Sequence, residues 1–130
     1  MVSAPSGWWC DAGLVLSFDD MTRTVYSTDN SIYQVIPEAV AVPATVDEIA
    51  NLLRTNSQSE SPSPIVARGG GTGTNGQSLT DGMTIDVKRK LCKVLSIDVE
   101  GRSAIVEPGV VTAELNAQLA PTGLFWAPHT

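Results

Sequence analysis

The residues of this chain with the clearest chemical potential are the glycines near its middle. Residues 69–76 read Gly-Gly-Gly-Thr-Gly-Thr-Asn-Gly, with five glycines in eight positions. Glycine adopts positive φ without steric cost, and we expect Gly73 to use that freedom. Successive backbone N–H groups of such a loop can converge into an anion-binding nest, and the side chains of Thr72, Thr74 and Asn75 add short donors. The pattern therefore predicts a site for a phosphate or a pyrophosphate.

Two common phosphate motifs do not account for this glycine loop (residues 69–76). A P-loop requires Lys followed by Ser or Thr after its last glycine, but Gln77 and Ser78 follow here. Residues 71–76 match the letters of the dinucleotide motif GxGxxG, which must open a helix. Residues 77–82 instead read as a polar turn before a strand. We therefore expect loop backbone, rather than a helix N-terminus, to hold the anion. A flexible linker is disfavoured because the loop lies between two apolar strands.

The elements around the loop indicate an α+β fold, a small mixed sheet with two packed helices. Thr45 is the expected N-cap of the first helix, with Glu48 completing a capping box. Thr112 is the expected cap of the second, with Leu115 and Leu119 facing inward. Strands are predicted at 39–42, 65–67 and 83–87, a hairpin at 94–99 and 103–106 turning at Glu100-Gly101, and helices at 45–56 and from 112 to about 120. Residues 1–26 form a weakly defined N-terminal segment.

The composition and net charge of the chain argue against several classes of function. The chain has 130 residues and a net charge of −6, which argues against a nucleic-acid partner. It contains no apolar run of about 18 residues that would indicate a transmembrane helix. Two separated cysteines, Cys10 and Cys92, suggest free thiols in a cytoplasmic setting and no metal site. No catalytic residue stands out: His129 is a weak candidate, and the carboxylates Asp86, Asp98, Glu107 and Glu114 are interpreted as strand-end or helix-face groups.

Several ordered motifs together resemble the FAD-binding domain of the vanillyl-alcohol oxidase (PCMH-type) flavoproteins. They are Arg-Gly-Gly-Gly-Thr-Gly at 68–73, Gln77-Ser78, Ile85-Asp86 and Glu107-Pro108-Gly109-Val110, preceded by Asp29-Asn30-Ser31-Ile32-Tyr33 and Pro37-Glu38-Ala39-Val40. Within this family, the sequences of these motifs are most similar to those of the branch of D-lactate and D-2-hydroxyglutarate dehydrogenases. The resemblance covers residues 27–130 and corresponds to the first α/β half of the family's domain, so we expect a truncated domain.

The resemblance implies FAD as cofactor and a parent flavoenzyme that oxidises a 2-hydroxy acid such as D-lactate, glycolate or D-2-hydroxyglutarate. It implies that the cofactor is bound by Arg68, Gly69, Gly70, Gly71, Thr72, Gly73, Thr74, Asn75, Gly76, Gln77, Ser78, Pro108, Gly109 and Val110. Thr72 occupies the position of a flavin-linking histidine in other branches, so binding is expected to be non-covalent. An iron–sulfur cluster would belong to a missing C-terminal part, and the parent would be cytoplasmic or peripheral to the inner membrane.

Two other functions remain open from the residues alone: a stand-alone nucleotide- or phosphate-binding module, and a structural domain whose glycine loop is only a turn. We expect the 130 residues by themselves to fold, to bind FAD weakly and to lack activity. We also expect an exposed apolar face at Leu124, Phe125 and Trp126, where the rest of the parent chain would dock and where self-association becomes plausible.

Overall fold

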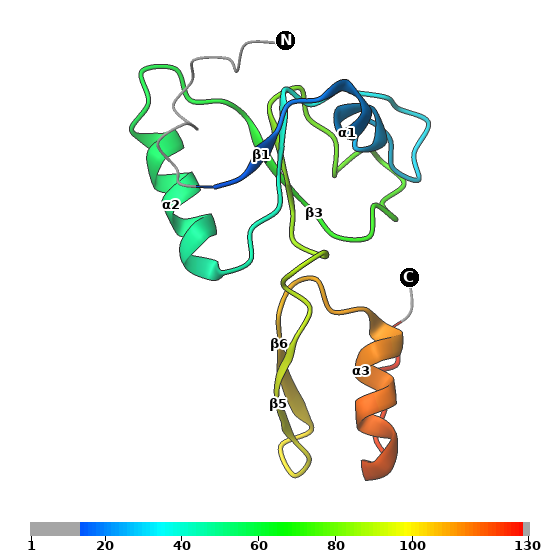
Figure 1. Ribbon diagram of the computed structural model, residues 1–130. Helices are drawn as coiled ribbons and strands as arrows, with labels where there is room; N and C mark the ends of the chain where they lie inside the picture. Colours follow the sequence, from blue (N-terminus) through cyan, green and yellow to red (C-terminus); the bar gives the residue numbers. More distant parts are fainter. Residues whose placement is uncertain (1–13, 129–130) are drawn as a thin grey trace.

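The computed structural model describes residues 14–128 (Figure 1). The helices and strands, in chain order, are β1 (Leu16–Ser17), α1 (Asp20–Val25), β2 (Ala39–Ala41), α2 (Val46–Ser57), β3 (Ile65–Arg68), β4 (Met83–Asp86), β5 (Val94–Asp98), β6 (Ser103–Val106), α3 (Thr112–Leu119) and a short 3₁₀ turn, η2 (Ala120–Thr122). The predicted strands and the two predicted helices are all present. The mixed α/β character of the fold is confirmed.

The central sheet has the strand order β1-β2-β4-β3. β2, β4 and β3 run parallel, with Ala39 and Ile65 both opposite Met83, and β1 adds an antiparallel edge. The sheet is therefore mixed, as predicted. β4 lies in the middle although it follows β3 in the sequence, so the chain returns from β3 to an inner position through residues 69–82.

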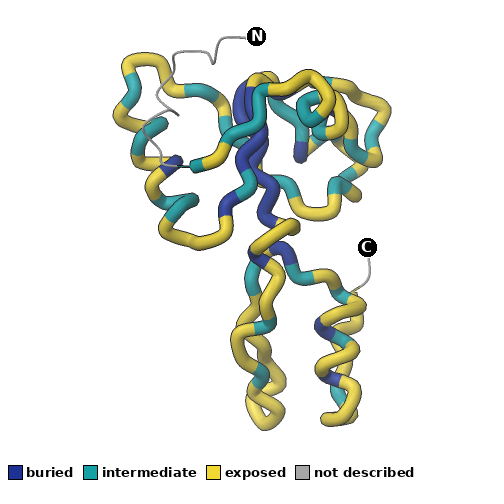
Figure 2. Tube along the Cα trace, viewed as in Figure 1, coloured by how far each residue is buried: buried dark blue, intermediate teal, exposed yellow. Residues whose placement is uncertain are grey.

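The hydrophobic core lies between this sheet and α2, which covers one of its faces (Figure 1). Leu52 of α2 is fully buried there against the side chains of β2 and β4. The other members of the core are Ala39, Ala41, Met83, Ile85, Val87 and Leu91. Because side chains alternate along a strand, Thr84 and Asp86 face the opposite side, where Tyr26 at the end of α1 contacts Asp86. Figure 2 shows the buried trace concentrated in these central strands.

The start of α2 follows the predicted capping pattern. Thr45 Oγ1 accepts a hydrogen bond from the Glu48 N–H at 3.1 Å. The Glu48 carboxylate returns to the N–H of Ala44 at 2.6 Å, one residue before the position that a capping box uses. Both donors at the helix entrance are satisfied, which explains why this helix was predictable from its sequence.

The second predicted helix begins as expected, but its predicted cap is wrong. Thr112 is the first helical residue, and the cap position is occupied by Val111, whose side chain can accept no hydrogen bond. The Glu114 carboxylate instead accepts a long, 3.5 Å hydrogen bond from the Val111 N–H. The dihedral angles of Val111 are extended, as an N-cap requires, so α3 begins without a side-chain hydroxyl cap.

Residues 92–128 form a hairpin lobe that extends away from the main lobe, residues 14–91 (Figure 1). β5 and β6 pair only with each other and make a separate two-stranded sheet. The turn between them contains Arg102 at a φ of 49°. α3 lies beside this hairpin, with Leu115 and Leu119 buried as predicted.

Sequence reasoning assigned no element to residues 14–26, where the structure has β1 and α1. α1 begins after Asp19, whose carboxylate accepts the Thr22 N–H at 2.8 Å. That hydrogen bond holds the pKa of the Asp19 carboxyl below its usual value. The acidic N-cap was a visible signal, but the helix has only 6 residues and buries none of them, so it has no apolar periodicity.

Candidate functional site

The glycine loop begins at the carboxyl end of β3, directly after Arg68. Parallel neighbouring strands usually need a crossover helix, yet residues 69–82 connect β3 to β4 without helical structure, as predicted. At the same edge, the Val87 N–H beyond β4 donates to the Arg68 carbonyl at 3.1 Å. In open α/β sheets this edge, outside the carboxyl ends of the strands, is where ligands bind.

Two glycines of the loop have positive φ, Gly71 at 67° and Gly76 at 73°. The expectation of positive φ at Gly73 was wrong. A Cβ at Gly73 would lie 2.4 Å from the side-chain amide carbon of Gln77, so a larger residue there would displace the Gln77 side chain. Gln77 folds back over the loop and accepts the Asn75 N–H at 3.0 Å.

Most backbone donors of the loop remain open. Within the described residues, the Asn75 N–H is the only one from residues 70–76 that donates to a protein acceptor. On the entry side, a Cβ placed on Gly69 would meet nothing within 4 Å. The side chains of Thr72, Thr74 and Asn75 are exposed. The loop thus combines N–H groups that have no protein acceptor with exposed short polar side chains, a donor set that fits an anion.

The guanidinium of Arg68 lies next to the backbone of the loop at Gly71. A Cβ on Gly71 would lie 2.5 Å from this guanidinium, so a larger residue would push the Arg68 side chain aside, and the φ of 67° already favours glycine there. The guanidinium stacks over the Tyr26 ring at 5.5 Å from the centroid and donates to the Tyr26 carbonyl at 3.4 Å. A fixed positive charge next to the Gly71 backbone makes the local potential favourable for a phosphate.

Tyr26 is in turn held by Asp86 at the end of β4. The Tyr26 hydroxyl donates to Asp86 Oδ2, while Asp86 Oδ1 accepts the N–H groups of Lys88 and Arg89 at 2.8 and 3.0 Å. Burial, followed by the hydrogen bond to Asp86, raises the pKa of Tyr26 above its usual value. Asp86 is therefore a structural strand-end carboxylate, as its position in the sequence indicated.

The segment 108–110 lies against the turn that follows β4. The Gly109 N–H donates to the Leu91 carbonyl at 2.8 Å. A Cβ on Gly109 would lie 2.4 Å from the Val87 carbonyl oxygen, so the backbones can approach this closely only at glycine. Because β3 and β4 are neighbours, this segment and the glycine loop occupy the same edge of the sheet.

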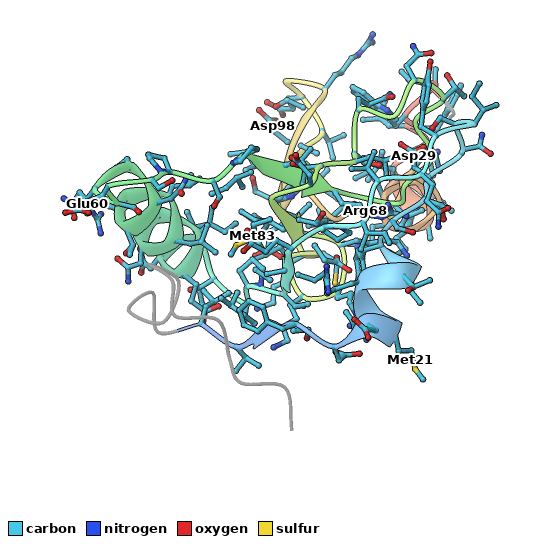
Figure 3. All side chains as sticks on the ribbon, turned by 90° about the horizontal axis from the view of Figure 1, so that it is seen from above. Met21, Asp29, Glu60, Arg68, Met83 and Asp98 are labelled. Atoms are coloured by element: carbon cyan, nitrogen blue, oxygen red, sulfur yellow. The ribbon has the colours of Figure 1, made fainter. Side chains whose placement is uncertain are left out.

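Sequence reasoning missed a contact that residues 27–35 make with the loop. The Asn30 N–H donates to the Gly71 carbonyl at 3.0 Å, and Ser78 Oγ donates to Asp29 Oδ2 at 2.9 Å. Figure 3 shows Asp29 and Arg68 on the same side of the molecule, with Glu60, beyond the end of α2, on the other. Asp29-Asn30-Ser31 entered the sequence analysis only as part of a family motif, because nothing in the spacing links it to a loop some 40 residues away.

The remaining carboxylates singled out from the sequence have structural partners. Asp98 accepts the Gly101 N–H at 2.9 Å in the hairpin turn, and Glu107 accepts the Lys93 N–H at 2.8 Å. Residues 14–128 contain no cluster of His, Cys, Asp and Glu that could hold a metal ion, and Cys92 is a free, exposed thiol. No helix within that range is long and apolar enough to cross a membrane. Cys10 and His129 lie outside the described residues.

Comparison with known families gives the loop its context. Residues 37–130 match the family described as FAD binding domain, a range that includes the glycine loop and the segment 108–110. The chain belongs to this family. It is 46% identical over 115 residues to a D-2-hydroxyglutarate dehydrogenase of Pseudomonas putida, covering 88% of this chain and 11% of that protein. It is 38% identical to a glycolate oxidase subunit of Bacillus subtilis, covering 86% of this chain and 24% of the relative.

The fold is shared more widely than the sequence. The structure of 6-hydroxy-D-nicotine oxidase from Arthrobacter nicotinovorans superimposes with a TM-score of 0.71 at 22% identity, over 87% of this chain and 25% of that one. At this identity the comparison shows the fold alone. The resemblance to flavoprotein FAD-binding domains that the sequence motifs suggested is confirmed.

Proposed function

We propose that the glycine loop binds the pyrophosphate of FAD. The observation that carries this proposal is the row of unpaired backbone N–H groups at the carboxyl end of β3, in a chain that belongs to a family of FAD-binding domains. Several N–H groups and one fixed guanidinium suit a doubly charged linear ligand. The proposed cofactor-contacting set is residues 68–78 together with Pro108, Gly109 and Val110.

The residues in this set have different roles. The N–H groups of the loop donate to the phosphate oxygens, and the charge of Arg68 stabilises them from behind the backbone. Gln77 closes the loop over Gly73, which keeps the chain compact around the ligand. Gly109 lets the 108–110 backbone lie close to the turn after β4, so that this segment borders the cofactor on a second side.

We further propose that residues 27–130 are the FAD-binding portion of a larger enzyme that oxidises a 2-hydroxy acid. Support comes from the named relatives and from the length comparison, since the chain spans 11% of the Pseudomonas putida dehydrogenase. Bound FAD would supply the hydride acceptor for such a reaction. The carboxylates Asp86, Asp98 and Glu107 already bind backbone N–H groups, so this chain positions the cofactor and leaves acid–base work to other residues. Any iron–sulfur cluster would likewise need ligands from outside these 130 residues.

The loop assignment is tested by replacing Gly71 with alanine in the full-length protein. Gly71→Ala places a side chain at a φ of 67° and against the Arg68 guanidinium, so we expect FAD affinity to fall at least tenfold. Gly123→Ala is the matched control, because Gly123 has a similar φ of 74° but caps η2 in the hairpin lobe. Both variants should lose about 1 kcal/mol of stability from the backbone strain.

Titration followed by flavin fluorescence measures the difference. Unchanged affinity in Gly71→Ala, or an equal loss in both variants, would contradict the assignment. Titration with inorganic pyrophosphate and with ADP separates an FAD site from a general phosphate-binding module, which would bind these ligands as tightly as FAD.

The non-covalent character of the binding is tested separately. Threonine cannot form the histidyl link to a flavin, so acid precipitation of the FAD-loaded protein should release all flavin into the supernatant. Yellow colour or flavin absorbance retained in the washed pellet would reject non-covalent binding while leaving the loop assignment intact.

A further inference from the structure

We propose that Asp29 is a positioning residue for the FAD site. It sets the conformation of the glycine loop through a two-point brace formed by residues 27–35. This inference rests on the proposed function of the loop, and Asp29 itself lies before residue 37, where the match to the FAD-binding family model begins.

The brace contacts the loop near both of its ends. At the first end, the Asn30 N–H donates to the Gly71 carbonyl at 3.0 Å. At the second, Ser78 Oγ donates to Asp29 Oδ2 at 2.9 Å, across 49 positions of sequence, and Ser78 is buried. Two attachments on either side of residues 72–77 restrict a glycine-rich segment that would otherwise sample many conformations.

The brace has a defined conformation of its own. Asp29 Oδ1 accepts the Ser31 N–H at 2.9 Å in an Asx turn, which fixes the backbone of Asn30 between them. The Val35 N–H donates to the Ser27 carbonyl at 2.9 Å, and Thr28 bridges Gln34, so the base of the segment is closed. Asp29 therefore uses one carboxylate oxygen to shape the brace and the other to hold the loop.

The bond to Gly71 has a directional consequence. In a trans peptide unit the C=O and the next N–H point to opposite sides. Because the Asn30 N–H donates to the Gly71 carbonyl, the Thr72 N–H points away from Asn30, and it has no acceptor among the described residues. The positive φ of Gly71 belongs to this same conformation. The brace thus orients a donor that we assign to the pyrophosphate.

The chemistry of Asp29 favours positioning over direct contact. A carboxylate repels a pyrophosphate and cannot donate to it. The hydrogen bond from Ser31, followed by that from Ser78, holds the pKa of the Asp29 carboxyl below its usual value, so the acceptor form persists. Its effect on FAD must therefore pass through Ser78 and Asn30.

The test uses the full-length protein and four variants: Asp29→Ala, Ser78→Ala, the double variant and Asp29→Asn. We expect each single alanine variant to weaken FAD binding about tenfold, since each breaks a hydrogen bond to a charged group. The double variant should bind no more weakly than the weaker single, because both remove the same contact. Asp29→Asn should recover most of the affinity, since its amide can accept the Ser31 N–H and donate to Ser78 Oγ.

Asp98→Ala is the matched control, because Asp98 makes a comparable turn bond to Gly101 in the distant hairpin. Its FAD affinity should stay within twofold of the native value. Hydrogen exchange of residues 69–78 without FAD gives a second readout, and in Asp29→Ala and Ser78→Ala we expect exchange to become faster there by more than in the core strands β2 and β4. Ser78→Ala retains the Asx turn, so it keeps the test valid if Asp29→Ala folds poorly.

The outcomes separate the two proposals. If the native protein binds FAD and both single alanine variants bind it within twofold as tightly, the positioning role is overturned and the loop assignment survives. Additive losses in the double variant would also overturn it, because two independent effects would then be at work. A native protein that binds no FAD overturns the loop assignment and, with it, this inference.

Discussion

The main lobe and the hairpin lobe differ in how much of their apolar surface they bury. In the main lobe the core residues of β2, β4 and α2 are almost completely enclosed. In the hairpin lobe all four residues of β6 are exposed, and most of the hairpin trace in Figure 2 has the colour of exposed residues. A groove of about 540 Å³ separates the hairpin from α3, with Leu115, Phe125 and Trp126 among its lining residues.

The difference shows which part of the chain contributes most of the favourable free energy of folding. Burial of apolar side chains is the main favourable contribution to folding, and nearly all of it lies in the main lobe. The glycine loop is attached to that lobe at β3, β4 and residues 27–35. The predicted apolar face is largely present in the hairpin lobe: Phe125 and Trp126 are 74% and 54% exposed, and Leu124 is half-buried in the groove wall. Self-association through this face stays a prediction.

The largest expected effect tests this comparison directly. Leu52→Ala removes a side chain with 0% exposure from the main-lobe core and should lower the free energy of unfolding by about 3 kcal/mol. Ile105→Ala in β6, where the side chain is 64% exposed, should lower it by less than about 0.5 kcal/mol. Urea denaturation of the 130-residue chain measures both. Similar losses in the two variants would mean that the hairpin lobe buries its apolar residues in solution.

A prediction of intermediate size tests whether the contact between Tyr26 and Asp86, next to the glycine loop, contributes to the stability of the main lobe. Tyr26→Phe removes the hydroxyl bonded to buried Asp86 and should cost about 1–2 kcal/mol at neutral pH. Tyr33→Phe, at an exposed tyrosine of the brace, should cost much less.

The same variant has a pH signature. Because the pKa of Tyr26 is raised in the folded state, the native protein holds this proton more tightly than the unfolded chain does. The resulting stabilisation is complete below the usual tyrosine pKa of about 10 and is lost as the pH rises through the higher folded-state value. Native protein should therefore lose more stability than Tyr26→Phe between pH 9 and 11, measured by urea midpoints. Parallel curves would show that Tyr26 does not carry this dependence.

The smallest expected effect is a gain. Thr84, in the middle of β4, is 1% exposed, and its Oγ1 has no hydrogen-bond partner among the described residues. Thr84→Val removes this buried hydroxyl and should raise the free energy of unfolding by up to about 1 kcal/mol.

Thr80→Val is the control for this gain, because Thr80 Oγ1 accepts the buried Gly82 N–H at 3.1 Å. It should lower the free energy of unfolding by about 1 kcal/mol. A loss of stability in Thr84→Val would indicate that the hydroxyl finds a partner in solution.

The sequence alone determined the local elements that have strong short-range signals. The capping pattern at Thr45 and Glu48 located α2, and the turn at Glu100-Gly101 located the hairpin. The run of glycines, together with the absence of a following helix signal, predicted a backbone anion site and argued against two other motifs. The order of several motifs led to the correct flavoprotein family. The helix, the hairpin and the glycine run each depend on residues within a few positions of one another, and the family resemblance depends on the order of such short motifs along the chain.

Only the tertiary structure decided which distant residues support the loop. Tyr26 and Asp29 precede it by some 40 residues, and no periodicity connects them to Arg68 or Ser78. The structure has positive φ at Gly71 and Gly76 rather than at Gly73, because the path of the loop is set by the hydrogen bond from Asn30 and by the packing of Gln77. A glycine permits many backbone conformations, and the sequence next to it does not select one of them. The selection comes from hydrogen bonds and contacts with segments that meet the loop only after the chain has folded.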